Sequence, residues 1–221
     1  KKSTIILSIL SFLTLFTSAN ADIKVVASIK PIHSLASYLM DGIAKPDLIV
    51  DGYASPHGFA LKPSHAKMLQ NADIVFWVGE DLENFLEKPL DSIAKKAEKI
   101  ELLEIKGLNK LKFRERNIFD DHDDHDDHAK KKDGHDDHDD HDGHEGHNHG
   151  EFDPHIWLDP INAKVILFEM SKHLIENDPS NETAYRANLS KAYKEIDKLT
   201  NDVTAELSES TASIVFHDAY Q

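Results

Sequence analysis

Short apolar runs alternate with longer amphipathic runs through the first half of the chain. The apolar runs predict strands at Ile23–Ala27, Asp47–Val50, Asp73–Val78 and Lys99–Leu103. The amphipathic runs predict helices at Pro31–Met40, Pro63–Gln70 and Leu82–Lys96. Two of these helices begin at proline, which the first helical turn tolerates. The alternation predicts an α/β fold in which helices cover both faces of a mostly parallel sheet.

The second half of the chain predicts two further helices and one more strand. Asp159-Pro160 is a strong helix start, and that helix is expected to end near Asn177. Apolar residues then recur three or four positions apart from Asn181 to Ser208. A helix of that length extends about 42 Å and suits a strut between two lobes. Ser213–Phe216 begins another strand.

These elements predict a domain plan of two Rossmann-like βα lobes joined by one long helix. The expected parts are a signal peptide at 1–21, an N-terminal lobe at 22–180, a linker helix at 181–208 and the start of a C-terminal lobe at 212–221. A parallel sheet does not end with one lone strand. We therefore expect the second lobe to be almost entirely missing from this chain.

The first 21 residues have the form of a secretory signal. Lys1 and Lys2 precede an apolar run from Thr4 to Phe16, and Ala19-Asn20-Ala21 fits the cleavage pattern. The run spans about 20 Å as a helix, too short for a membrane anchor. The chain has no cysteine, hence no disulfide and no thiol for a lipid anchor. We expect a soluble protein in a Gram-negative periplasm.

A stretch from Asp120 to Gly150 consists almost entirely of His, Asp, Lys and Gly. It holds nine of the 15 histidines: His122, His125, His128, His135, His138, His141, His144, His147 and His149. Such a segment cannot form a core, and we expect it to be disordered. Imidazole is the commonest metal ligand among side chains, so the composition indicates handling of divalent cations.

The charge of the chain is concentrated in this insert. The whole chain carries a net charge of −15, of which twelve Asp, one Glu and three Lys give the insert −10. No basic face balances it, so a nucleic-acid partner is not expected. Histidines at every third position lie about 10 Å apart in an extended chain. We therefore expect several weak metal sites in the insert and no single tight one.

Three histidines outside the insert share a setting that suits a metal site. His57 and His217 follow strands, and His155 precedes a helix. Ligands of open α/β sheets bind beyond the carboxyl ends of the strands, and three neutral imidazoles suit Zn²⁺. Asp153, Asp159 and Asp218 are candidates to accept the second ring N–H. Each of these histidines could instead cap a helix or satisfy a buried carbonyl.

The remaining histidines, His33, His65 and His173, lie within predicted helices. We interpret all three as surface or packing residues, because an isolated histidine on a helix has no ligand partner in view.

A set of short motifs, taken in order, resembles the periplasmic zinc-binding proteins of ABC uptake transporters. This cluster of receptors also includes manganese and iron receptors and adhesin-like relatives. The matching segments are Ser55–His57, Leu61–Ser64, Leu69–Asp73, Trp77–Gly79, His155–Pro160 and Val215–Tyr220. A His/Asp-rich insert before the second ligand loop is typical of the zinc members.

The resemblance implies a ligand set and a mechanism. His57, His155 and His217 fall at the family's three histidine positions. In the family the fourth ligand is a carboxylate of the second lobe, a Glu of the first ligand loop or water. Here Pro56 stands before His57, so the loop Glu is absent. The receptor is implied to capture Zn²⁺ between the lobes, as a monomer, and to deliver it to a membrane permease powered by a cytoplasmic ATPase.

Other functions stay open at this point. A manganese or iron receptor, an adhesin-like relative or a periplasmic zinc buffer would fit the same composition. A zinc hydrolase would also use three histidines and a water, but it needs a general base, and no Glu flanks the predicted ligands. We therefore expect a binding protein and not an enzyme.

Overall fold

The computed structural model describes residues 22–112, 151–207 and 219 of the chain. Its strands are β1 (Val25–Ile29), β2 (Asp47–Val50), β3 (Ile74–Trp77) and β4 (Glu98–Glu101). They form one sheet in the order β2-β1-β3-β4, and every neighbouring pair is parallel. The predicted α/β fold around a parallel sheet is thereby confirmed.

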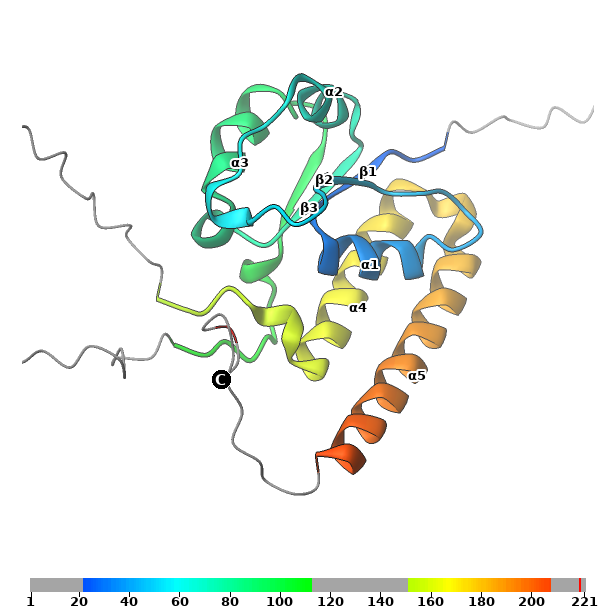
Figure 1. Cartoon of the computed structure of the whole chain (residues 1–221). Coiled ribbons are helices and arrows are strands. Elements are labelled where there is room, and N and C mark those ends of the chain that lie inside the picture. The colour runs from blue at the N-terminus through cyan, green and yellow to red at the C-terminus, as the bar shows by residue number, and fades with distance from the viewer. Residues whose placement is uncertain (1–21, 113–150, 208–218, 220–221) are drawn as a thin grey trace, which may run out of the picture.

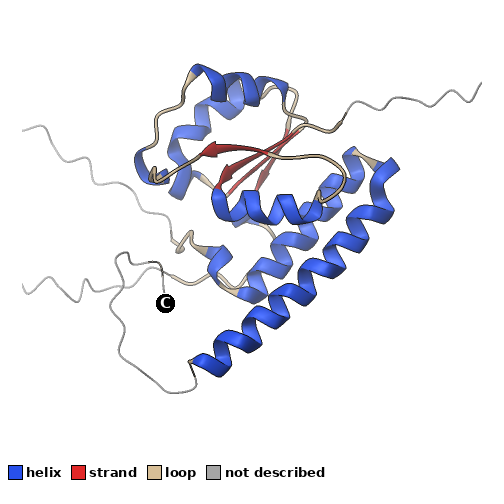
Figure 2. Cartoon of the chain, turned by 45° about the vertical axis from the view of Figure 1, so that its right-hand side comes forward, coloured by secondary structure: helices blue, strands red, loops and turns tan. Residues whose placement is uncertain are grey.

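Helices cover both faces of this sheet, as Figure 1 and Figure 2 show. The helices are α1 (Lys30–Leu39), α2 (Pro63–Asn71), α3 (Glu80–Ser92), α4 (Pro160–Asn177) and α5 (Glu182–Glu206). α2 and α3 lie on one face, and α1, α4 and α5 lie on the other. Both faces of the strands are therefore covered, which explains why every residue of β1 and β3 is buried.

The core is built from the two central strands and the apolar stripes of the helices. Phe76 of β3, Ile32 of α1 and Ile166 of α4 are all completely buried. Burial of each such side chain contributes roughly 1.5–3 kcal/mol to folding. Because α4 joins this core after the insert, residues 151–177 belong to the same packed unit as the first four strands.

The long helix α5 begins inside this unit and ends outside it. Tyr185 is fully buried and donates to Asp178 Oδ2 at 3.1 Å, while Asn188 Nδ2 donates to the carbonyl oxygen of Leu39 at 2.9 Å. Further along the same stripe, Leu199 and Leu207 are 62% and 67% exposed. The predicted helix is confirmed, but only its first half packs on the lobe that the structure describes.

Several element boundaries differ from the prediction. β1 runs from Val25 to Ile29 and not from Ile23 to Ala27, and α3 begins at Glu80 and not at Leu82. α3 ends at Ser92 and not at Lys96, because the amides of Ile93 and Ala94 both turn back to the carbonyl of Pro89. β4 ends at Glu101, and Leu102–Glu104 forms a 3₁₀ turn where a strand was predicted. Leu102 is fully buried, so its apolar character reflects packing rather than strand structure.

Several predicted segments lie outside the described residues. They are the signal peptide, the His/Asp-rich insert and the strand at Ser213–Phe216. Within residues 22–112 and 151–207, no helix combines the length and the apolar character needed to cross a membrane.

Candidate metal site

His57 lies on a short turn beyond the carboxyl end of β2. A 3₁₀ turn at Pro56–Gly58 carries it, with Pro56 in the first position, where no N–H is needed. The Ser55 side chain caps this turn by accepting from the His57 amide at 3.3 Å. The local sequence Ser-Pro-His-Gly therefore fixes the backbone while leaving the imidazole exposed.

Aromatic packing holds this turn against the lobe. The ring centroid of Phe59 lies 5.2 Å from that of Phe85 on α3 and 5.4 Å from that of His65 on α2. His65 is itself buried, and its Nδ1 accepts from the Lys62 amide at the start of α2. Burial and the nearby Lys62 charge lower the pKa of His65, which favours the neutral acceptor form.

His155 lies on the other side of the site, just before α4. Its backbone amide and its Nδ1 both contact Asp153 Oδ1, at 3.0 Å and 2.6 Å. The His155 and Asp153 side chains are only 10% and 7% exposed. A carboxylate that accepts from Nδ1 leaves the lone pair of the other ring nitrogen, Nε2, to act as a metal ligand.

The two histidines approach each other although they come from distant parts of the chain. Their ring centroids lie 6.1 Å apart. Two imidazoles bound to one tetrahedral zinc ion have ring centroids about 5 Å apart, so a small adjustment brings this pair to that geometry. Trp157 packs edge-on against His155 at 5.3 Å and restricts its ring.

Both histidines line one hollow of about 410 Å³ at the carboxyl edge of the sheet. Ile29 of β1, Val50 of β2 and Trp157 contribute to its wall. Ala219 lines the same hollow and is itself buried. It follows His217 by two positions in the sequence, although His217 and Asp218 lie outside the described residues.

A buried carboxylate under this edge was not identified from the sequence. Glu83 of α3 is completely buried, and its Oε2 accepts from the amides of Val78 and Gly79 at 2.7 and 3.1 Å. The backbone at Glu83 is not helical, which lets the side chain fold back onto the end of β3. Its other oxygen lies near the buried Ser28 hydroxyl without reaching good hydrogen-bond geometry. Burial raises the pKa of Glu83 to about 7.

Glu83 connects to the site through packing. α3, which carries Glu83, contacts the turn that carries His57. The two amides that donate to Glu83 directly follow the end of β3. Gly79 has φ of +151°, and a Cβ there would lie 2.8 Å from Glu101 Oε1. The positive φ favours glycine here, because other residues rarely adopt it. The one sequence signal for this arrangement was the glycine that closes the strand.

The other predicted site residues lie in different places. Asp159 caps α4 by accepting from the Ile161 amide at 2.7 Å, as the Asp-Pro motif predicts. Its part in orienting a ligand histidine stays a prediction. The nine insert histidines lie outside the described residues, so their metal binding also stays a prediction.

The three histidines interpreted as surface or packing residues have defined contacts. His33 Nε2 lies 3.0 Å from the carbonyl oxygen of Pro46, and His65 caps α2. His173 differs from both, because its ring lies among glutamates of α4 and β4. It is therefore not the isolated histidine that the sequence suggested.

Comparison with known proteins connects this geometry to a family. The family model described as ZnuA, the periplasmic component A of a zinc-uptake complex, matches residues 25–221. A relative from Brucella abortus (strain 2308), named a high-affinity zinc uptake system protein, is 49% identical over 209 residues and 89% of this chain. A relative of the same name from Paracoccus denitrificans is 40% identical over 89% of the chain. The chain spans 62% and 61% of the length of these two relatives.

Solved structures support the same fold at lower identity. The Zn(II)-bound ZnuA-like domain of Streptococcus pneumoniae AdcA has a TM-score of 0.61 and 18% identity, over 86% of this chain and 58% of that one. A Mn-bound periplasmic metal-binding protein from Candidatus Liberibacter asiaticus has a TM-score of 0.62 and 20% identity, over 83% and 57% of the two chains. At this identity the likeness shows the fold alone.

Proposed function

We propose that this chain, which belongs to the family of periplasmic A components of zinc-uptake complexes, captures Zn²⁺ for delivery to an ABC transporter. The observation that carries the proposal is the approach of His57 and His155 over one hollow, with Asp153 bonded to the His155 ring. A fixed imidazole and an exposed imidazole facing the same space can bind one ion between them.

The third ligand in this proposal is His217. The described Ala219 lines the hollow with the two other histidines, which supports a ligand from this part of the chain. Asp218 would orient the His217 ring as Asp153 orients His155. Water or a carboxylate from elsewhere in the protein would supply the fourth ligand.

Zinc is the cargo that this ligand set favours. Neutral imidazole nitrogens bind Zn²⁺ well, whereas Mn²⁺ prefers oxygen ligands. The relatives from Brucella and Paracoccus are named for zinc uptake, which supports the same choice. Asp153 already bonds to the His155 ring, which favours a positioning role over that of a general base in a hydrolase.

The His/Asp-rich insert serves in this proposal as a collector of cations. Its net charge of −10 raises the local concentration of divalent ions near the receptor. Its histidines would bind these ions weakly and exchange them with the tighter site. The insert therefore gathers zinc, and the histidines of the folded lobe select and hold it.

The remaining parts of the proposal concern the protein's surroundings. The first 21 residues would direct export and be cleaved, leaving a monomer in the periplasm without a lipid anchor. A membrane permease would receive the ion, and a cytoplasmic ATPase would power its release. The family description names a periplasmic component of a zinc-uptake complex, which supports membrane partners of this kind.

A genetic replacement tests this function. In the bacterium that encodes the protein, His57→Ala should reduce growth and cellular zinc under zinc limitation, and added zinc should restore both. His33→Gln is the matched control, because His33 contacts the Pro46 carbonyl away from the hollow. Growth of the His57→Ala strain at the unmodified rate in zinc-poor medium would contradict the proposal.

A further inference from the structure

A second group of metal-ligand side chains lies at the end of the sheet opposite His57 and His155. Glu98 is the first residue of β4, whereas the two histidines lie beyond the carboxyl ends of the strands. His173 and Glu176 belong to the last turns of α4. They lie about 20 Å along α4 from its start near His155. The two sites therefore cannot share one ion.

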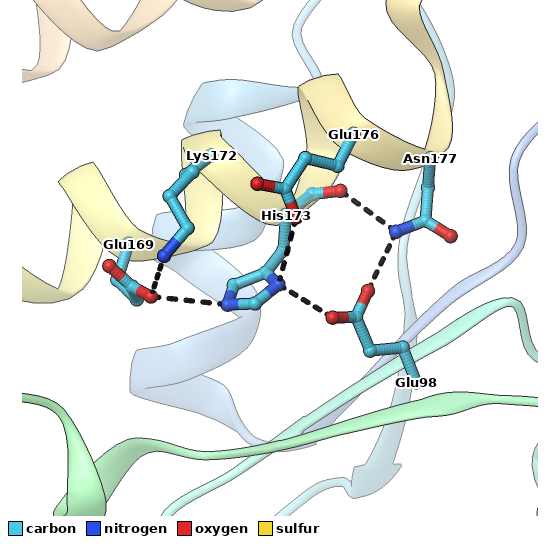
Figure 3. Close-up of polar contacts among 6 residues, drawn as sticks. All are labelled: Glu98, Glu169, Lys172, His173, Glu176 and Asn177. Carbon is cyan, nitrogen blue, oxygen red and sulfur yellow. Dashed lines mark hydrogen bonds and ion pairs between the residues drawn. The ribbon is translucent and has the colours of Figure 1, made fainter.

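The three side chains converge closely enough to surround a cation (Figure 3). His173 Nδ1 lies 2.8 Å from Glu98 Oε1 and 3.8 Å from Glu176 Oε2. One ligand atom from each residue lies within 4.8 Å of the other two. No other such group of three occurs among the residues that the structure describes.

The other ring nitrogen of His173 is already engaged. Its Nε2 lies 3.2 Å from Glu169 Oε1, and Lys172 forms an ion pair with the same carboxylate. The hydrogen bond from Lys172 lowers the pKa of Glu169, so this group stays an ionised acceptor. In the tautomer that carries its proton on Nε2, His173 donates to Glu169 and turns its Nδ1 lone pair toward Glu98 and Glu176, which is the arrangement of a carboxylate–histidine–metal triad.

Neighbouring contacts fix the cluster before any ion binds. Asn177 Nδ2 donates to Glu98 Oε2 at 2.7 Å and to the carbonyl oxygen of His173 at 2.9 Å. The His173 side chain is only 14% exposed, whereas Glu176 is 57% exposed. The cluster is thus held by two elements and remains open to solvent on the Glu176 side.

Charge decides what can occupy the space between these groups. His173 Nδ1 lies at hydrogen-bond distance from Glu98 Oε1, so it shares a proton with that carboxylate. A divalent cation that binds here replaces this proton. Glu98, Glu169 and Glu176 with Lys172 leave a net charge of −2 around the ring, which favours the doubly charged ion.

We propose that Glu98, His173 and Glu176 bind a divalent transition-metal ion at this position, with Glu169 orienting the histidine. One nitrogen and two carboxylate oxygens suit Zn²⁺, and water would complete its coordination. This site does not depend on the proposed function, because it shares no ligand with the proposed uptake site. It would be a second zinc site, at the end of the sheet where β4 begins.

Anomalous diffraction at the zinc edge tests this site directly. Crystals of the protein grown near neutral pH with Zn²⁺ in excess should show an anomalous peak about 2.0–2.1 Å from His173 Nδ1. In Glu176→Gln the affinity of the site should fall roughly tenfold or more, since a ligand is lost, so the peak should be weaker in crystals soaked with limiting Zn²⁺. Glu176 is largely exposed, so this variant keeps the fold.

Glu87→Gln is the matched control, because it removes an exposed glutamate charge on α3 and should leave the peak unchanged. Absence of a peak at His173 in the unmodified protein overturns the proposal, whether or not zinc is found between His57 and His155. A peak of equal height in Glu176→Gln at limiting Zn²⁺ overturns the proposed ligand set.

Discussion

The imidazoles of His57 and His155 face one hollow with their ring centroids 6.1 Å apart. One follows the second strand of the chain, and the other follows the insert. Parallel strands end at the same edge of a sheet, so loops far apart in the sequence meet there. The turn after β2 and the segment that precedes α4 meet at this edge, which brings the two histidines together.

Loss of the Asp153 carboxylate should weaken zinc binding at this pair. In Asp153→Ala the His155 ring loses the acceptor for its Nδ1 proton and the backbone amide loses its partner. We expect the dissociation constant of the tightest zinc ion to rise about 10- to 100-fold. Competition with a chelator measures it, and Asp91→Ala, an exposed carboxylate on α3, is the control. An unchanged constant would mean that Asp153 serves the backbone alone.

Asp159 should matter for folding more than for zinc. Asp159→Ala removes the side chain that caps α4, which should lower the free energy of unfolding by about 1 kcal/mol. If Asp159 serves only as the cap of α4, the zinc dissociation constant should change less than twofold. Urea unfolding and chelator competition on the same sample separate the two effects. A large loss of affinity would restore Asp159 as an orienting residue of the site.

The buried carboxylate of Glu83 should make stability depend on pH. Its pKa rises from 4.5 to about 7 on folding, so the folded protein retains a proton that the unfolded chain has lost. This contribution to stability is fully present below pH 4.5 and is lost as the pH rises through 7. The whole change amounts to roughly 3 kcal/mol. Glu83→Gln should remove the part of the fall in the free energy of unfolding with rising pH that Glu83 causes.

Urea unfolding between pH 4.5 and 7 checks the Glu83 prediction. The free energy of unfolding of Glu83→Gln should fall less steeply with rising pH than that of the unmodified protein. Glu87→Gln, an exposed glutamate on the same helix, should follow the unmodified protein. Parallel curves for Glu83→Gln and the unmodified protein would show that Glu83 stays ionised in the fold.

Much of the fold could be predicted because its signals are local. The run Asp73–Val78 is apolar on both faces of its strand, which is typical of a sheet covered by helices on both sides. Asp159-Pro160 marks a helix start, because Asp caps the first turn and Pro fits its first position. The end of α3 could not be predicted, since it depends on two amides returning to Pro89. The outer half of α5 keeps the apolar spacing of its inner half, so the sequence does not show where packing stops.

The metal chemistry divides in the same way. The loops carrying His57 and His155 could be chosen because they flank predicted elements, but their separation depends on how α4 packs against the sheet, which no local pattern gives. The sequence predicts no ligand partner for His173, because Glu98 lies on a strand far away in the sequence. The spacing of Glu169, His173 and Glu176 places all three on one helix face, which is a signal that the sequence alone contains.

In the proposed function, zinc is held tightly by histidines of the folded lobe and not by the insert. Zinc titration with a competing chelator should find one tight site after deletion of residues 120–150. Replacing His57 by Ala in that deletion protein should abolish the tight site, and replacing His33 by Gln should not. Loss of tight binding on deletion of the insert alone, with His57 and His155 intact, would show that the insert holds the zinc.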